Sequence, residues 1–251
     1  MPDSIYCYPN SEVLVNKLGI RDAKILFEAE KELTAIRIRE LQETPIRGKF
    51  DFVHLQKIHK YIFQDIYTWA GKVRTVEIGK GNLFCTTACI HEYAKTVFQK
   101  FFPQCYHVKD NRDEFIKVFA DNYGDLNALH PFREGNGRTQ REFARLVCLE
   151  CGYSFQLSHA THKQMLEASR LSFDLGDSSK LIEIFSEGIF EFDEMNANEN
   201  VISILTADDM HIKIPDFYDH YDYKDMENAN TYTVLYKEKI HKMNDEINRR
   251  K

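Results

Sequence analysis

Apolar residues recur every three to four positions along most of the chain, which is the spacing of amphipathic helices. Residues 21–43 show this period first, and Thr44-Pro45 ends the helix because the residue before a proline disfavours helical backbone. Asp51 is placed to cap a second helix over residues 51–66. The same period predicts helices over 90–101, 113–129, 137–151 (with Gly152 as its C-terminal cap), 161–173 and 178–191.

One stretch has a different period. Residues 72–78 alternate between apolar and polar positions, residues 79–82 have the composition of a turn, and residues 83–85 read as a return strand. The pattern predicts a short β-hairpin in a helical neighbourhood. Because an isolated hairpin is marginally stable in water, we expect it to pack on helices or to receive a strand from a partner.

The C-terminal part has a different character. Asn and Glu dominate residues 196–200, which we interpret as a boundary. Beyond it, residues 201–205 predict a strand, residues 216–223 are acidic and aromatic, and residues 231–250 predict a helix. We therefore divide the chain into residues 1–195 and a C-terminal extension, residues 196–251, which forms a small α/β appendage of unassigned role.

Composition narrows the class of protein. Hydrophobic residues make up 43% of the chain, enough for a core. Residues 1–190 contain 25 basic and 25 acidic side chains, so the net charge of −6 comes from residues 191–251, which contain 8 basic and 14 acidic side chains. This charge argues against direct nucleic-acid binding. Neither a signal peptide nor a membrane-spanning run is recognisable, so we expect a cytoplasmic protein, with export as an effector left open.

The CxxC pair and most of the histidines are expected to have structural and not chemical roles. Cys148 and Cys151 form a CxxC, but they fall in a helical apolar pattern with no second ligand pair, so we interpret them as core thiols. Most histidines have no chemical neighbours in the sequence and are expected to be packed or on the surface. They are His54, His59, His91, His107, His159 and His162.

The densest chemistry lies between two predicted helices, at residues 130–141 (HPFREGNGRTQR). Pro131 ends the first helix, and the glycines beside Asn136 give a loop whose backbone can approach a ligand closely. Arg138 and Arg141 share a face of the next helix. The N–H groups of a helix start, its dipole and two guanidinium groups together favour a di- or triphosphate.

Three further side chains complete this segment. Glu134 can hold Mg²⁺, which takes one or two carboxylates together with phosphate oxygens. His130 can accept a proton from a hydroxyl near neutral pH, and Phe132 is expected to be a core anchor. A capped helix start with surface arginines is the simpler interpretation, but it does not explain two glycines, an asparagine and a glutamate beside a histidine.

The segment resembles the signature of the Fic family, HPFx[D/E]GNGRxxR, at every defined position. Residues 62–74 (IFQDIYTWAGKVR) and the hairpin after them also resemble this family, and the resemblance covers roughly residues 10–190. It implies an all-α fold for residues 1–195, a Fic-type helical bundle with a small β-hairpin flap beside the active site. It also implies a protein adenylyltransferase that moves AMP from ATP to a Ser, Thr or Tyr hydroxyl of a target protein.

The resemblance implies a role for each residue. His130 would deprotonate the target hydroxyl, which attacks the α-phosphorus in line while pyrophosphate leaves, and Glu134 would bind Mg²⁺. The phosphates would be held by the residues of the loop and the helix start. These are Gly135, Asn136 and Gly137 for the α- and β-phosphates, Arg138 for the β-phosphate and Arg141 for the γ-phosphate. Stabilisation of the leaving charge would be mainly electrostatic.

Gly137 bears on the group that is transferred. The related Doc kinases have a lysine at this position and bind the nucleotide the other way round. Glycine keeps the space for the β-phosphate open, which favours AMP transfer over phosphate transfer. The base pocket is not readable from the sequence, so transfer of UMP or phosphocholine stays open.

The hairpin resembles the target-docking flap of the family. An exposed hairpin edge can add a strand of the target and bring its hydroxyl to His130. The flap residues are Ile78, Gly79, Lys80, Gly81 and Leu83, and Ile78, Lys80 or Leu83 would pinch the target chain. Tyrosines of the chain itself are a further expected substrate, through self-modification.

Many Fic enzymes carry an inhibitory helix, [S/T]xxxE[G/N], whose glutamate pairs with the second arginine of the signature. The sequence has no match to it; the nearest is Ser179-x-x-x-Glu183, followed by Ile184, which we interpret as ordinary helix surface. Two alternatives follow. Either a separate small antitoxin supplies the glutamate to Arg141, as in a toxin–antitoxin pair, or the enzyme runs unrestrained.

A second class of function stays open alongside the enzyme. A degenerate Fic fold could serve as a nucleotide-binding or interaction module. The presence of His130 favours the enzyme, because a binding module has no need of a base.

Overall fold

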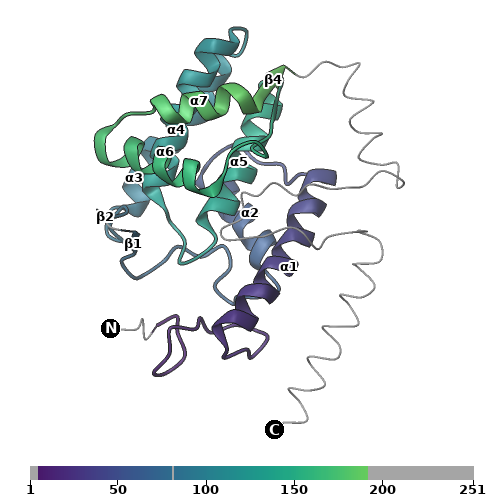
Figure 1. Ribbon diagram of the computed structural model, residues 1–251, viewed down its shortest axis with the longest axis vertical. Helices are drawn as coiled ribbons and strands as arrows, with labels where there is room; N and C mark the ends of the chain where they lie inside the picture. The colour runs from purple at the N-terminus through teal and green to yellow at the C-terminus, as the bar shows by residue number, and fades with distance from the viewer. Residues whose placement is uncertain (1–4, 81, 192–251) are drawn as a thin grey trace.

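A computed structural model of the chain describes residues 5–80 and 82–191. Helices form most of this part, with two small antiparallel sheets at its edges (Figure 1). The helices are α1 (Ala23–Glu43), α2 (Phe52–Phe63), α3 (Ile90–His107), α4 (Arg112–Leu129), α5 (Asn136–Glu150), α6 (His162–Leu175) and α7 (Ser179–Gly188). The strands are β1 (Gly79–Lys80), β2 (Asn82–Leu83), β3 (Tyr153–Phe155) and β4 (Ile189–Glu191). The predicted all-α class is confirmed.

Helix α5 lies at the centre of the bundle, where α2, α4 and β3 pack against it (Figure 1). Its Phe143 is fully buried and meets the rings of Phe50, Phe98 and Phe101 at centroid distances of 6.0, 5.4 and 5.8 Å. Aromatic pairs in such edge and tilted geometries stabilise a core beyond the area they bury. Helix α5, which begins within the segment at 130–141, is therefore firmly packed in the core.

Side chains at the helix starts explain where several helices begin. Asp51 accepts a hydrogen bond from the backbone N–H of His54, as predicted, and Asp22, Asn111 and Thr161 cap α1, α4 and α6 in the same way. Each such cap contributes about 1 kcal/mol. The predicted bounds of α1, α4 and α5 are correct to within two residues.

The predicted hairpin is present, but its strands are short. β1 and β2 pair in the register Gly79↔Leu83 and Lys80↔Asn82. The prediction that residues 72–78 form a strand is wrong, because groups of this arm bond elsewhere. The Arg74 N–H donates to the Pro131 carbonyl at 2.9 Å, and the Arg74 side chain takes the Val76 carbonyl.

A second sheet was not predicted. β3 follows α5 and pairs antiparallel with β4. The predicted helix over 178–191 therefore ends at Gly188, and its last three residues form β4. Gly152, with a φ of 87°, supplies the left-handed turn after α5 that was expected of it.

Helix α3 runs six residues past its predicted end, through Pro103. A proline inside a helix removes one backbone hydrogen bond, which makes it a usual stop signal. Phe101 and Cys105 on either side of it are fully buried, and α3 packs along α4. Tertiary packing therefore overrides the local signal.

The structure also bears on the cysteines and on membrane crossing. Cys148 and Cys151 are buried, as predicted, and burial raises the pKa of the Cys151 thiol to about 12. Within the described residues, none of the helices combines the length and apolarity that a membrane crossing requires. The predictions for residues 196–251 lie outside the described residues.

Candidate active site

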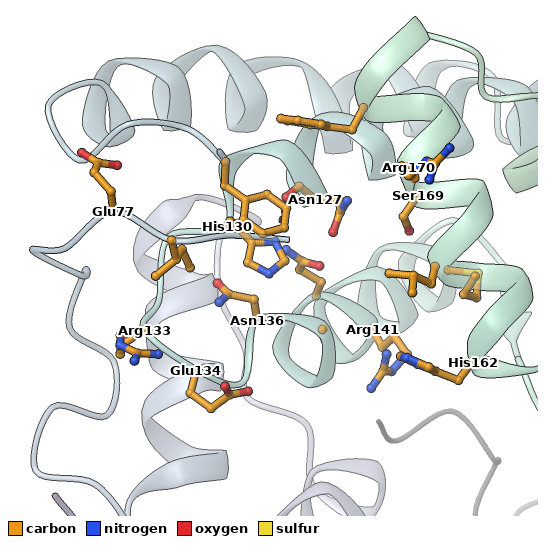
Figure 2. A pocket seen from close by; sticks show the side chains of 18 of the residues that line it. Glu77, Asn127, His130, Arg133, Glu134, Asn136, Arg141, His162, Ser169 and Arg170 are labelled. Carbon is orange, nitrogen blue, oxygen red and sulfur yellow. Dashed lines mark hydrogen bonds between the residues drawn. The ribbon is translucent and has the colours of Figure 1, made fainter. Parts of the chain in front are cut away.

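A cleft with a volume of about 840 Å³ opens between residues 130–141, the flap arm at 76–84 and one face of α6 (Figure 2). Its size is typical of small-molecule sites. Figure 2 shows Glu77 on one side of His130, with His162 on the other. The segment that the sequence singled out thus lines a cleft and is not a surface turn.

His130 follows the last residue of α4 with left-handed backbone, at φ 39° and ψ 59°. Its Nδ1 lies 2.9 Å from the carbonyl oxygen of Asn127. A carbonyl only accepts hydrogen bonds, so Nδ1 carries the proton and Nε2 is the nitrogen that can take one up. The Phe84 ring stacks on the imidazole, with centroids 3.7 Å apart and planes 6° apart. Helix α4 and the flap together fix the tautomer and the ring plane of the predicted base.

The loop between α4 and α5 is folded around the Asn136 side chain. Oδ1 accepts from the N–H of Phe132 at 2.9 Å, and Nδ2 donates to the carbonyl of the same residue at 2.8 Å. Phe132 is fully buried, which confirms its predicted role as an anchor. Because the Asn136 amide is committed to the loop, the phosphate contact predicted for this residue is left to its backbone N–H.

His59 of α2 holds the same loop through its imidazole ring. Its Nδ1 accepts from the N–H of Gly71 at 2.7 Å, and its Nε2 donates to the Glu134 carbonyl at 3.0 Å. The ring also stacks on Phe132, with centroids 3.8 Å apart. Burial lowers the pKa of His59 to about 3, so the side chain is neutral at pH 7. The prediction that His59 is packed is confirmed.

The two glycines beside Asn136 have different roles. Gly135 has a φ of 79°, and a Cβ there would lie 2.0 Å from the Phe63 ring, so any other residue would be strained and would have to displace that ring. Gly137 lies in the first turn of α5, and its Cβ would stand 3.3 Å from Nη1 of Arg141. Gly137 therefore keeps the space next to Arg141 open, in line with its predicted role.

The start of α5 has the backbone geometry that suits an anion. The first N–H groups of a helix have no acceptors within the helix, and its dipole is positive at this end. No acidic residue occupies the first turn of α5. Asn136, Gly137 and Arg141 all line the cleft, so the structure brings a helix start and a guanidinium to one wall.

Arg138 is placed differently from its prediction. It is 7% exposed and does not belong to the cleft lining. Its Nη2 donates to the Glu30 carboxylate of α1, and its Nη1 donates to Oγ1 of Thr34 at 3.1 Å. The Tyr67 hydroxyl donates to the second oxygen of Glu30. The predicted contact with a β-phosphate would require the guanidinium to leave this buried network.

Glu134 places a carboxylate in the cleft, with 42% of its side chain exposed. Its Oε1 accepts from the N–H of Gly135 at 2.8 Å and lies 3.8 Å from Nη2 of Arg138. Mg²⁺ keeps several waters and binds proteins through one or two carboxylates plus phosphate oxygens. An exposed carboxylate beside an anion-binding helix start fits a metal ion that arrives with a nucleotide.

The residues predicted to dock a target lie along the flap. Ile78 and Gly79 line the cleft, whereas Leu83 of β2 is 60% exposed. Lys80 pairs with Asn82 in the backbone ladder, and Gly81 lies outside the described residues. An exposed apolar side chain on a two-stranded sheet is the feature that strand addition uses.

Sequence reasoning missed the wall that α6 contributes. His162, Ser169 and Arg170 line the cleft opposite the flap, and none of the three was among the predicted site residues. Only an amphipathic period marked this helix, and that signal does not tell which face meets a ligand. Glu183, by contrast, is exposed on α7 and is no part of the cleft lining, as expected of ordinary helix surface.

Fold and cleft together define a helical domain that can hold a polyphosphate at a helix start beside a histidine base. The profile of the Fic/DOC family matches residues 49–148, and the chain belongs to this family. The "Probable protein adenylyltransferase Fic" of Salmonella typhimurium is 35% identical over 188 residues, which are 74% of this chain and 92% of that protein.

A second relative is longer. "Protein adenylyltransferase VbhT" of Bartonella schoenbuchensis is 37% identical over 211 residues, which are 81% of this chain and 44% of VbhT. The chain thus spans less than half of VbhT and nearly all of the Salmonella protein.

Solved structures share the fold. The N-terminal Fic domain of a VirB-translocated Bep effector protein from Bartonella quintana, with bound ADP, has a TM-score of 0.72 at 27% identity and covers 78% of this chain and all of that one. BepC from Bartonella tribocorum, with bound AMPPNP, has a TM-score of 0.70 at 23% identity and covers 75% of this chain and 98% of that one.

Proposed function

We propose that this chain is a protein adenylyltransferase that transfers AMP from ATP to a hydroxyl of a target protein. One observation carries the proposal: the Nδ1–H of His130 is committed to the Asn127 carbonyl, which makes Nε2 a base in the same cleft as an anion-binding helix start. Two relatives named as adenylyltransferases and a structural neighbour with bound ADP support it.

In this proposal the chemistry is a direct displacement. The target hydroxyl attacks the α-phosphorus, its proton passes to Nε2 of His130, and the bond between the α-phosphorus and the bridging oxygen breaks. Pyrophosphate carries away the negative charge. The N–H groups at the start of α5 and the Arg141 guanidinium stabilise that charge, which is how phosphoryl and nucleotidyl transfer are mainly catalysed.

Glu134 would hold Mg²⁺ together with the phosphates. A bound Mg²⁺ would neutralise part of the charge that develops on the leaving group. The carboxylate is also anchored by the N–H of Gly135, so its position depends on the same loop that shapes the phosphate site. Metal and phosphate binding would therefore depend on one another.

The target would dock by adding a strand to the flap. Strand β2 carries the exposed Leu83, and Phe84, the next residue, stacks on the His130 ring. A chain laid along this strand would bring a Ser, Thr or Tyr hydroxyl towards the base. Self-modification of an exposed tyrosine would use the same reaction.

We further propose that a separate small antitoxin restrains the enzyme by placing a glutamate against Arg141. The nearest internal candidate, Glu183, lies outside the cleft lining. Glu183→Gly should therefore leave the rate of AMP transfer unchanged, and a sharp rise would show that the brake is internal.

Six free cysteines in the sequence are typical of a reducing compartment such as the cytoplasm.

The experiment uses ATP labelled at the α- or the γ-phosphate, Mg²⁺ and a bacterial lysate. We expect label on protein from α-labelled ATP only, and its loss in His130→Ala. Label from the γ-phosphate only would identify a kinase, and label from α-labelled UTP would identify uridylyl transfer. Nucleotide binding without label under any condition would favour a binding module.

A further inference from the structure

Among the charged side chains of the described residues, Arg74 is the most deeply buried, with none of its side-chain surface exposed. Its Nε donates to the His130 carbonyl at 2.9 Å, and its Nη1 donates to the Val76 carbonyl at 2.9 Å. Its Nη2 donates to the Cys85 carbonyl. Three backbone carbonyls therefore converge on one guanidinium, whose planar fork of donors suits this arrangement.

These carbonyls belong to parts of the chain that must be aligned for transfer. Val76 lies in the arm that enters the flap, Cys85 in the arm that leaves it, and His130 carries the base. The backbone N–H of Arg74 adds a bond to the Pro131 carbonyl at 2.9 Å. One residue thus fastens both arms of the flap to the consecutive backbone carbonyls of His130 and Pro131.

The backbone that Arg74 holds is in an unfavourable conformation. His130 has a φ of 39° and precedes a proline, which disfavours helical backbone of the preceding residue. Left-handed backbone at a non-glycine residue costs on the order of 1 kcal/mol or more and persists only where the surroundings impose it. The bonds from Arg74 to the backbone carbonyls of His130 and Pro131 supply such a constraint.

Glu77 links Arg74 to the arm that leaves the flap. Its carboxylate lies 3.4 Å from Nη1 of Arg74 and accepts from the N–H of Thr87 at 2.9 Å and from the Thr87 hydroxyl at 2.7 Å. The hydrogen bonds from Thr87 lower the pKa of Glu77, so the carboxylate stays charged. The base of the flap is therefore closed by a charged pair and not by strand pairing.

We propose that Arg74 is a positioning residue that couples the target-docking flap to the His130 base. It touches neither nucleotide nor target; it sets where the flap stands relative to Nε2 of His130. This proposal rests on the proposed AMP transfer for its kinetic readout, but the placement of the flap can be measured without any reaction.

The test compares Arg74→Gln with wild type in two assays. In hydrogen exchange without nucleotide, we expect the amides of residues 76–87 to exchange faster in the variant. In AMP transfer, we expect kcat to fall by about 10- to 100-fold, the loss typical of a reacting group misplaced by about 1 Å. The KM for the target should rise, whereas the Kd for ATP should stay within about threefold, because the phosphate site is intact.

Arg112→Gln is the matched control. Arg112 also donates to backbone carbonyls, those of Ser186 and Ile189, but it ties α4 to the end of α7, away from the cleft. It should lose stability without faster flap exchange and without a loss of kcat at temperatures where it is folded. Arg74→Lys, which keeps the charge but not the fork, provides a milder variant should Arg74→Gln fail to fold.

The two proposals fail in different ways. If wild type transfers nothing, the proposed function fails, and flap exchange alone decides the role of Arg74. If a folded Arg74 variant keeps both the flap exchange and the kcat of wild type, the inference is overturned. It is equally overturned if Arg112→Gln reproduces both losses, because the effect would then be general destabilisation.

Discussion

Glu30→Gln tests the buried network that holds Arg138. Glu30 and Arg138 are 9% and 7% exposed, and Tyr67 and Thr34 satisfy further polar atoms of the pair. Removing one partner of a buried ion pair costs about 3–5 kcal/mol, because the other charge is left in a poorly solvated place. Glu134, 3.8 Å from the guanidinium, compensates in part. We therefore expect Glu30→Gln to lower the free energy of unfolding by about 2–4 kcal/mol.

The assay is urea unfolding at pH 7, with Asp65→Asn as the matched control. Asp65 pairs with Arg37 through two hydrogen bonds of 2.6 and 3.0 Å, but 27% of the Arg37 side chain and 32% of the Asp65 side chain are exposed, and pairs screened by solvent contribute about 1 kcal/mol. Combining Glu30→Gln with Arg138→Met should recover part of the loss, because both charges are then gone. If Glu30→Gln and Asp65→Asn lower the free energy of unfolding by the same amount, burial does not set the cost of breaking the Glu30–Arg138 pair.

The same variant decides between two roles of Arg138. If the guanidinium stays in its network when ATP binds, Glu30→Gln leaves the Kd for ATP within about twofold, which is what the structure leads us to expect. If Arg138 exchanges Glu30 for the β-phosphate, as the family resemblance implies, removing its competitor tightens ATP binding. Calorimetric titration with ATP and Mg²⁺ separates the two outcomes.

Two further predictions concern the loop at 130–141. Gly135→Ala should cost about 2–4 kcal/mol in urea unfolding, from left-handed strain and from the clash with Phe63, whereas Gly137→Ala should fold normally and lose AMP transfer. The pKa of His59 is lowered to about 3 in the fold, so its contribution is present above its unfolded pKa near 6.5 and is lost as the pH falls below that. Wild type should lose about 2 kcal/mol more than His59→Phe between pH 7 and pH 5, as measured by urea midpoints, and equal losses would show that His59 is accessible to protons.

Local patterns predicted the helices well because caps and apolar periods act over a few residues. Asp51 caps α2, and the period over 113–129 matches α4. Features that depend on distant parts of the chain escaped this reasoning. Pro103 sits inside α3 because Phe101 and Cys105 are buried against the bundle, and β4 forms only because β3 is there to pair with it.

The site shows the same division. Residues 130–141 can be recognised from the sequence because many chemically active side chains lie close together there, and the structure brings most of them to one cleft. Arg74 and Glu30 lie 56 and 108 positions from their partners and carry no local signal of a role. The placement of Arg138 shows the limit most clearly, because a motif names a residue type but not the neighbour that claims its side chain.

The central claim is that His130 is a base in a working transferase and not a remnant in a binding module. The most direct measurement is the His130→Ala variant with ATP and Mg²⁺, assayed in parallel for the Kd of the nucleotide and for AMP transfer to protein. We expect an ATP affinity close to that of wild type and a transfer rate lower by about 10²- to 10⁴-fold, the usual contribution of a general base. Transfer at the wild-type rate by His130→Ala would contradict it.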